Sequence, residues 1–195
     1  RSELPLIVID VQRGGPSTGL PTKTEQTDLR QALYGRNGES PIVVLAAASP
    51  TDCFDMAYWA SKIALERVMP VILLTDGYIA NGSSAWRIPD LEQYPAITPH
   101  DISQYTGNEW NSALRNDETM VRYWAEAGLE GYTHRIGGLE KDFKTGAIST
   151  DAANHQKMTD VRQQKVDKVA DIIPQLELIG GEDAELLRSE ERRVG

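Results

Sequence analysis

The order of apolar and polar residues along the first 76 positions is typical of a chain that alternates between strands and helices. Uninterrupted apolar runs occupy residues 5–11, 41–48 and 70–75. Such a run, without polar alternation, is typical of a strand that is buried on both faces of a parallel sheet. We therefore predict three parallel strands, each covered on both faces.

Two helical segments separate the predicted strands. Residues 24–34 follow Thr24, a suitable N-cap, and a helix that ends at Val68 begins after Thr51 or Asp52. In the second segment apolar residues recur at helical spacing, which predicts the face that packs on the sheet. This predicted stripe comprises Phe54, Ala57, Tyr58, Ser61, Ala64, Leu65 and Val68. The order strand, helix, strand, helix, strand predicts an α/β fold with a doubly wound parallel sheet.

The pattern weakens after the third strand. Residues 86–132 contain prolines, glycines and polar residues without a clear period. We predict an irregular excursion there, with one short helix at residues 117–127. Residues 155–173 have the pattern of a long charged helix, and Pro174 would end it.

The same pattern predicts a division into domains. Residues 3–95 would form the sheet domain, and residues 96–178 would form the excursion and a linker helix. Residues 179–187 would open a truncated second domain, with a hinge at Gly180–Gly181 and a first strand at residues 185–187.

The two ends of the sequence form a separate prediction. The tail RSEERRVG, residues 188–195, matches the translation of a common sequencing adaptor residue for residue, and residues 1–2 match the end of the reverse-strand adaptor. We therefore expect both stretches to be adaptor translation. A solvated, charged helix end is the alternative for the tail.

Composition and charge exclude several classes of function. The formal net charge of −9 argues against binding to nucleic acid or to an anionic membrane surface. Every apolar run is shorter than the roughly 20 residues that cross a bilayer, and no signal pattern is present. The single cysteine, Cys53, excludes an internal disulfide, and we expect a cytoplasmic protein. One cysteine and three scattered histidines cannot hold an iron–sulfur cluster, so any such cluster must bind another chain.

The loop after the first predicted strand carries the main candidate for ligand binding. Ligands of open α/β sheets bind beyond the carboxyl ends of the strands, so Arg13 is expected at the rim of a cleft. Its guanidinium can hold a carboxylate through two parallel hydrogen bonds. The candidate loop residues are Arg13, Gly14, Gly15, Ser17, Thr18, Gly19 and Thr22. Because the loop contains neither a P-loop nor a dinucleotide fingerprint, a rigid connection with a surface arginine is an equal alternative from spacing alone.

The loop also carries a resemblance to a known family. Residues 13–29, RGGPSTGLPTKTEQTDL, resemble the signature of the α subunit of 2-oxoacid:ferredoxin oxidoreductases, in which a GPSTG-x-PT stretch precedes a Q-x-DL element. The resemblance continues in the family's order through YGRNGE, SPTDCF, PVILLTDGY, RIGGLE and NHQKM. It covers nearly all of residues 3–187, and the loop is most similar to the 2-oxoglutarate branch.

This resemblance implies a truncated pyrimidine-type domain that binds thiamine diphosphate, followed by a linker helix. In the family the cofactor, with Mg²⁺, is shared with a β subunit, and iron–sulfur clusters pass electrons to ferredoxin. The implied reaction is oxidative decarboxylation of a 2-oxoacid with coenzyme A to an acyl-CoA. The family's active-site arginine, which recognises the substrate's carboxylate and keto group, falls on Arg13. Gly14, Gly15, Ser17, Thr18 and Thr22 match the motif as neighbours of that site.

Several functional segments of the family have no counterpart in this sequence. They are a Y-P-I-T-P segment with a substrate-contacting threonine, a glutamate that activates the cofactor's aminopyrimidine, and a later W-G-S-T-type segment. Arg13 is therefore the only major catalytic side chain of the family expected here, and we expect this fragment alone to be inactive. An acidic ferredoxin would be repelled by the acidic chain and is expected to dock on another subunit.

Two other classes of function remain open at this point. LIVIDVQ and the PTDCF segment resemble, more faintly, an isochorismatase-like cysteine hydrolase, in which Asp10 would orient a base and Cys53 would be the nucleophile. The spacing does not fit that family well, and such a cysteine is more often a small buried residue. A non-catalytic interaction module that kept the fold is the third class. The three histidines (100, 134 and 155) share no ligand spacing and are expected on the surface.

Overall fold

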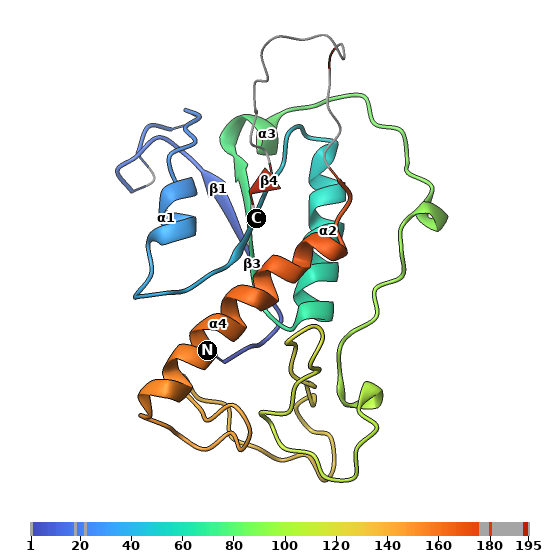
Figure 1. Ribbon diagram of the computed structural model, residues 1–195. Helices are drawn as coiled ribbons and strands as arrows, with labels where there is room; N and C mark the ends of the chain where they lie inside the picture. Colours follow the sequence, from blue (N-terminus) through green and yellow to red (C-terminus); the bar gives the residue numbers. More distant parts are fainter. Residues whose placement is uncertain (1, 18, 22, 176–179, 181–192, 195) are drawn as a thin grey trace.

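The computed structural model describes residues 2–17, 19–21, 23–175, 180 and 193–194. Three parallel strands form its centre: β1 (Leu6–Gln12), β2 (Val43–Ala46) and β3 (Pro70–Asp76). β3 lies between β1 and β2, and a short strand, β4 (Arg193–Val194), pairs antiparallel with the other edge of β2. The three predicted strands therefore lie alongside one another (Figure 1).

Helices cover both faces of the sheet, which confirms the predicted doubly wound α/β arrangement. α1 (Leu29–Tyr34) packs through Ala32 against Val44 and Leu74 on one face. α2 (Asp52–Arg67) packs through Met56 and Ile63 on the other face, where the larger core cluster lies. A short helix, α3 (Gly77–Asn81), directly follows β3.

β1 is less buried than its sequence predicts. Leu6, Val8 and Ile9 are 55%, 44% and 62% exposed, although the continuous apolar run indicated a strand covered on both faces. The reason is its place in the sheet: among the described residues β1 pairs only with β3 and forms an edge. The prediction of the strand is confirmed, and the prediction of its burial is wrong.

α1 begins later than predicted, and Thr24 does not cap it. The residue at its N-cap is Asp28, whose backbone N–H donates to Gln12 Oε1 at 3.0 Å. Gln26 Nε2 donates to Asp76 Oδ2 at 2.8 Å. These side chains of β1 and β3 hold residues 25–28 across the strand ends, so the helix starts only at Leu29.

The face of α2 that packs on the sheet agrees with the predicted stripe only in part, because Ala64 and Val68 are buried as predicted but other members are not. Phe54 and Ala57 are exposed, whereas Met56, Ala60 and Ile63 are completely buried. The predicted face is instead partly covered by the excursion, which runs along α2: Tyr94 donates to Asp55. Further along, Lys62, Glu66 and Leu65 hydrogen-bond to Ala96, Thr98 and His100 respectively.

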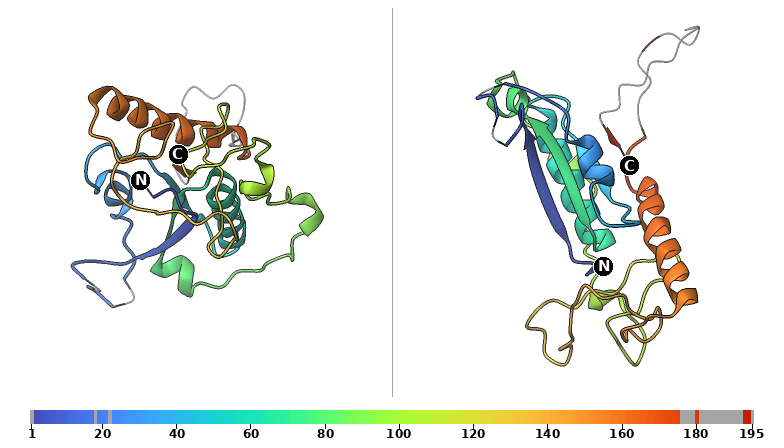
Figure 2. Two further views of the ribbon diagram at one scale, coloured as in Figure 1. Left: turned by 90° about the horizontal axis from the view of Figure 1, so that it is seen from below. Right: turned by 90° about the vertical axis from the view of Figure 1, so that its left-hand side faces the viewer.

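The excursion is irregular as predicted, with two 3-10 turns, η1 (Leu91–Gln93) and η2 (Ile102–Gln104), but residues 117–127 form no helix. The side chain of Asn116 accepts the backbone N–H groups of Glu118 and Thr119, and Met120 has a φ of 61°. This local turn competes with helix formation. Figure 1 and the right-hand view of Figure 2 show the middle of the excursion at the amino ends of the strands, opposite the loop after β1.

The predicted long helix is confirmed as α4 (Ala152–Asp167), extended by a 3-10 turn, η3 (Lys168–Asp171). It begins at Ala152 because the Asp151 carboxylate caps it and accepts the Asn154 N–H at 2.7 Å. Lys165 Nζ donates to the Val68 carbonyl at 3.0 Å, which attaches α4 to the end of α2.

Part of the predicted domain division lies outside the described residues, namely Gly181 of the hinge, the strand at residues 185–187 and residues 188–192 of the tail. Within the described ranges, no helix is both long enough and apolar enough to cross a membrane.

Candidate functional site

The loop after β1 is folded back on its own start by a few hydrogen bonds. The Gly14 N–H donates to the Lys23 carbonyl at 3.1 Å, and the Gly14 carbonyl accepts the Leu20 N–H at 3.0 Å. The Gly15 N–H donates to Glu25 Oε2 at 3.1 Å. The loop is therefore a defined structure at the carboxyl end of β1.

One glycine of the loop is required by its geometry. Gly19 has a φ of 48°, and a Cβ atom built on it would lie 1.5 Å from the Gly14 carbonyl oxygen. Any other residue would clash with backbone and would also adopt an unfavourable left-handed conformation. Ser17, with a φ of 60°, is exposed on the same loop.

Arg13 lies at the carboxyl edge of the sheet, directly after β1. Its Cγ lies 4.0 Å from the point where a Cβ on Gly77 would stand, so the side chain passes over the turn that follows β3. Arg13 is exposed and lines an open hollow together with Gly15 and Asp28. With the residues that the structure describes, the Arg13 guanidinium forms no hydrogen bond or ion pair. It is therefore available to an anionic ligand.

Carboxylates share this hollow with Arg13. The pKa of Asp10 is raised, mainly by burial and to a smaller extent by the charge of Asp28. Glu25 is engaged by the Gly15 N–H. The hollow therefore combines an unpaired guanidinium with a carboxyl whose pKa is raised.

A second hollow, of about 210 Å³, lies at the carboxyl ends of the strands. Gln12, Ala46 and Thr75 line it from β1, β2 and β3, and Leu29 contributes to its apolar wall. Thr75 Oγ1 is buried there and has no hydrogen-bond partner among the described residues. A buried hydroxyl in this condition is a candidate for hydrogen bonding to a ligand.

Asp76 anchors the turn between β3 and α3. Its Oδ1 accepts the N–H groups of Tyr78 at 2.8 Å and Ile79 at 2.9 Å. Burial alone would raise the pKa of Asp76, but the hydrogen bonds from Ile79, Gln26 and Tyr78 outweigh it and lower this pKa. Asp76 is therefore an ionised structural cap that fixes the turn beneath Arg13.

The sequence-predicted site residues lie on one loop, although not all can be described. Arg13, Gly14, Gly15, Ser17 and Gly19 are in place, while Thr18 and Thr22 lie outside the described residues. Sequence reasoning missed Gln12, Gln26 and Thr75, which line the second hollow. Gln26 belongs to the Q-x-DL element, which could have indicated it. Thr75 ends an apolar run, and only the fold shows its unpartnered hydroxyl.

The cysteine-hydrolase interpretation finds no support. Cys53 packs against the larger core cluster, and its thiol donates to the Ser49 carbonyl at 3.6 Å. Asp10 lines the hollow of Arg13 on β1, so the two do not share a pocket. Among the described residues, no three His, Cys, Asp or Glu side chains are grouped to hold a metal ion. His100 is 9% exposed, so the prediction that all three histidines lie on the surface is wrong.

A parallel α/β sheet with an unpaired arginine and a polar hollow at its carboxyl edge defines a ligand-binding domain of the doubly wound class. Comparison of the sequence with protein families identifies the class more closely. Residues 1–153 match the family described as pyruvate flavodoxin/ferredoxin oxidoreductase, thiamine diP-binding, and the chain belongs to this family.

Individual relatives agree with this membership. The chain is 54% identical, over 95% of its length, to 2-oxoglutarate oxidoreductase subunit KorA of Mycobacterium tuberculosis, and 40% identical, over 89% of its length, to the α subunit of 2-oxoacid:ferredoxin oxidoreductase 1 of Sulfurisphaera tokodaii. It spans 28% and 27% of these two proteins.

A solved structure has the same fold. It is 2-oxoglutarate:ferredoxin oxidoreductase from Magnetococcus marinus, with 2-oxoglutarate, coenzyme A and succinyl-CoA bound. The TM-score is 0.80 and the sequence identity 36%, over 93% of this chain and 31% of that chain.

Proposed function

We propose that this chain forms part of the α subunit of a 2-oxoacid:ferredoxin oxidoreductase that acts on 2-oxoglutarate. The reaction is oxidative decarboxylation of the 2-oxoacid with coenzyme A to an acyl-CoA and carbon dioxide. The two electrons released pass through an iron–sulfur cluster on a partner chain to ferredoxin. The 54% identity to a 2-oxoglutarate oxidoreductase subunit supports this substrate.

Arg13 is the observation that carries the proposal. A 2-oxoacid offers a carboxylate next to a keto oxygen, and a planar guanidinium can donate to both. The location of Arg13 beyond the carboxyl end of β1, without a partner among the described residues, supports this role. Its loop is fixed through Gly14 and Gly19, so the backbone of Arg13 is held at the cleft before substrate arrives.

The second hollow fits one part of thiamine diphosphate. Its apolar wall, formed by Leu29, Leu74 and Ile79, suits an aromatic ring, and the unpartnered Thr75 hydroxyl suits a ring nitrogen or amino group. When bound, the cofactor supplies the electron sink that decarboxylation needs. In this proposal the diphosphate of the cofactor and its Mg²⁺ are bound by a β subunit.

The same considerations support the remaining partners. Because the chain carries a net charge of −9, an acidic ferredoxin would be repelled by it and is expected to dock on another subunit. Cys53 is a free cysteine, so the chain has no disulfide that would require an oxidising compartment. This favours a location in the cytoplasm.

The test is replacement of Arg13 by Ala and by Lys in the enzyme assembled with its partner subunit. Loss of two charge-assisted hydrogen bonds is expected to lower kcat/KM for 2-oxoglutarate-dependent ferredoxin reduction by roughly 100-fold. Arg13→Lys keeps the positive charge but loses the planar pair of donors. Its kcat/KM is therefore expected to lie between the values of the wild type and of Arg13→Ala.

Arg30 is the matched control. It is exposed on α1, outside both hollows, and Arg30→Ala is expected to leave kcat/KM unchanged. Wild-type turnover by Arg13→Ala at both limiting and saturating 2-oxoglutarate would remove Arg13 from this role.

A further inference from the structure

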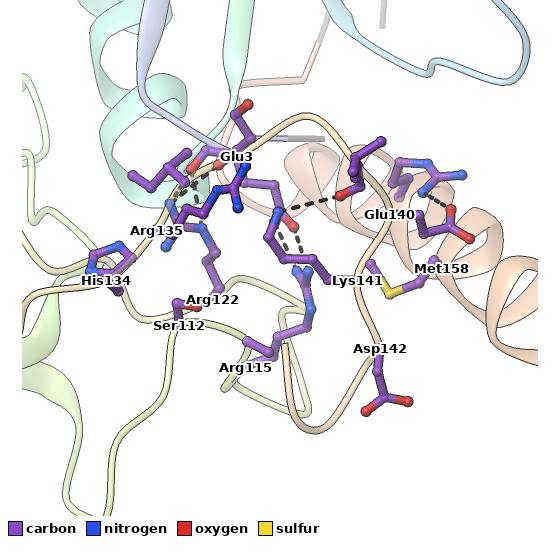
Figure 3. A pocket seen from close by; sticks show the side chains of 15 residues that line it. Glu3, Ser112, Arg115, Arg122, His134, Arg135, Glu140, Lys141, Asp142 and Met158 are labelled. Atoms are coloured by element: carbon purple, nitrogen blue, oxygen red, sulfur yellow. Dashed lines mark hydrogen bonds and ion pairs between the residues drawn. The ribbon is translucent and has the colours of Figure 1, made fainter. Parts of the chain in front are cut away.

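A second, smaller site lies at the opposite end of the sheet from Arg13. A cavity of about 40 Å³ lies between the start of the chain, the excursion and α4 (Figure 3). A space of this size holds a few water molecules or one small ion. Because it lies at the amino ends of the strands, it is separate from the two hollows described above.

The charges around this cavity are not balanced. Its cationic lining residues are Arg115, Arg122, Arg135, Lys141 and Arg162. Its acidic lining residues are Glu3, Glu140 and Asp142. The imbalance is local, because the chain as a whole is acidic, with a net charge of −9.

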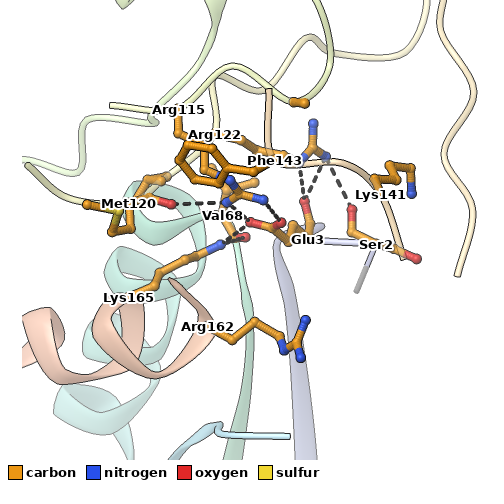
Figure 4. A network of polar contacts seen from close by, with 12 residues as sticks. Ser2, Glu3, Val68, Arg115, Met120, Arg122, Lys141, Phe143, Arg162 and Lys165 are labelled. Atoms are coloured by element: carbon orange, nitrogen blue, oxygen red, sulfur yellow. Dashed lines mark hydrogen bonds and ion pairs between the residues drawn. The ribbon is translucent and has the colours of Figure 1, made fainter. Parts of the chain in front are cut away.

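Two of the three acids already form ion pairs, each with one arginine of the lining and one basic side chain outside it. Glu3 binds both Arg115 and Lys165, the latter at 2.7 Å (Figure 4). Glu140 contacts Arg162 at 3.4 Å and His155 at 2.9 Å.

The third acid, Asp142, does not offset the charge either. Its carboxylate accepts the backbone N–H groups of Lys144 and Thr145 within its own turn. Its side chain points away from the cavity (Figure 3). The acids of the described lining therefore leave part of the cationic charge without a carboxylate.

Arg122, Lys141 and the exposed Arg135 carry this remaining charge. Arg122 is 4% exposed, and its guanidinium donates to the Glu3 carbonyl at 2.7 Å instead of to a carboxylate. Lys141 Nζ donates to the Gly137 carbonyl at 2.7 Å. The pKa of Lys141 is lowered, mainly by burial and to a smaller extent by the charge of Arg122. Carbonyl dipoles stabilise these cations less than an anion in the cavity would.

The lining also includes nitrogen atoms without partners. Arg115 Nε, Arg162 Nε and His134 Nε2 are buried and have no hydrogen-bond partner among the described residues. All three residues line this one cavity. Buried nitrogen atoms usually have partners, so these three are donors on lining residues that the described part of the chain leaves without an acceptor.

From these observations we propose that the cavity binds a phosphoryl oxyanion. A tetrahedral oxyanion carries several acceptor oxygens and about two negative charges, which suits converging guanidinium and ammonium donors. Because Arg135 of the lining is exposed, the cavity would also be accessible to the terminal phosphoryl group of a larger molecule. The proposal does not depend on the function assigned to Arg13.

The test is isothermal titration calorimetry of the full chain with inorganic phosphate at low ionic strength. Saturable binding with a stoichiometry of one is expected. Lys141→Gln and Arg135→Gln each remove a charged donor near the opening and are expected to raise Kd about tenfold. Both residues are at least partly exposed, so the folded structure should be retained, as circular dichroism would verify.

Lys144→Gln is the matched control. It removes the same charge from the same segment, but Lys144 is exposed and does not line the cavity, so Kd should stay within about twofold of the wild-type value. Absence of phosphate binding would overturn the proposal. It would also be overturned if Lys144→Gln weakened binding as much as Lys141→Gln, because this would indicate attraction by general surface charge.

A parallel titration with adenosine monophosphate distinguishes the two sources of the anion. Equal or weaker binding than phosphate, with the same dependence on Lys141, indicates a free oxyanion. Tighter binding with that dependence indicates the phosphoryl group of a larger ligand. If neither ligand shows a dependence on Lys141, the cavity is not an oxyanion site.

Discussion

Gly19 is the residue at which the loop after β1 comes closest to its own start. Its positive φ and its contact with the Gly14 carbonyl allow the Leu20 N–H to reach that carbonyl. The direction of the chain between Arg13 and Leu20 therefore depends on a residue without a side chain. At this scale the candidate site is a backbone structure that holds one guanidinium.

Replacement of Gly19 by Ala is expected to disrupt this loop. The new Cβ would overlap the Gly14 oxygen, and an alanine at φ 48° is strained, so we expect a loss of about 1–3 kcal/mol in the free energy of unfolding. Hydrogen exchange is expected to show faster exchange of the Leu20 N–H. Gly138→Ala is the control, because a Cβ on Gly138 meets nothing within 4 Å and its φ is not positive. Unchanged Leu20 exchange in Gly19→Ala would contradict this account.

At the scale of elements, the sequence predicted what depends on local pattern. The three strands and α2 follow from continuous apolar runs and from helical spacing, and they lie where they were predicted. α1 was predicted too long, because its start is set by Gln12, which is sixteen positions before Asp28. No window of neighbouring residues contains such an interaction.

The packing face of α2 illustrates the same limit. Phe54, Ala57 and Tyr58 form an apolar stripe that resembles a core face, but partners from the excursion, such as Tyr94, lie against this side. The candidate site was predicted through the loop sequence. The hollow with Thr75 was missed, because its walls come from three strands and meet only after folding.

The cap of α4 gives a direct test at the scale of one element. Asp151→Ala removes the acceptor for the Asn154 N–H and is expected to lower the free energy of unfolding by about 1 kcal/mol. Asp151→Asn retains a capping oxygen and is expected to change it by much less. Urea denaturation of both variants measures the difference. Equal losses for Ala and Asn would mean that the charge at this helix end matters and the cap does not.

At the scale of the whole molecule, Glu3 connects distant parts of the chain. Its carboxylate binds Arg115 of the excursion and Lys165 of α4, and both cations are nearly buried. Lys165 also donates to the Val68 carbonyl at the end of α2 (Figure 4). The start of β1, the end of α2, the excursion and α4 therefore meet at a single carboxylate.

Glu3→Gln is expected to destabilise the protein strongly at neutral pH. The substitution leaves Arg115 and Lys165 buried without their shared counter-charge, and loss of one partner of a buried ion pair typically costs about 3–5 kcal/mol. Urea denaturation at pH 7 measures this loss. Glu130→Gln is the control. Glu130 is exposed, so this substitution removes the same charge at a place outside the network.

The effect of Glu3 on stability should depend on pH with a definite sign. Burial alone would raise the pKa of Glu3, but Lys165 and Arg115 outweigh it and hold this pKa well below the usual 4.5. A carboxyl whose folded pKa is depressed contributes its full stabilisation above the unfolded pKa and loses it as pH falls. The difference between wild type and Glu3→Gln should therefore shrink as the pH falls below about 4.5. Asp10 and Asp76 are present in both proteins, so their contributions to the pH dependence of stability cancel in this difference. A gap that does not shrink as the pH falls would mean that Glu3 acts through its shape and not through its charge.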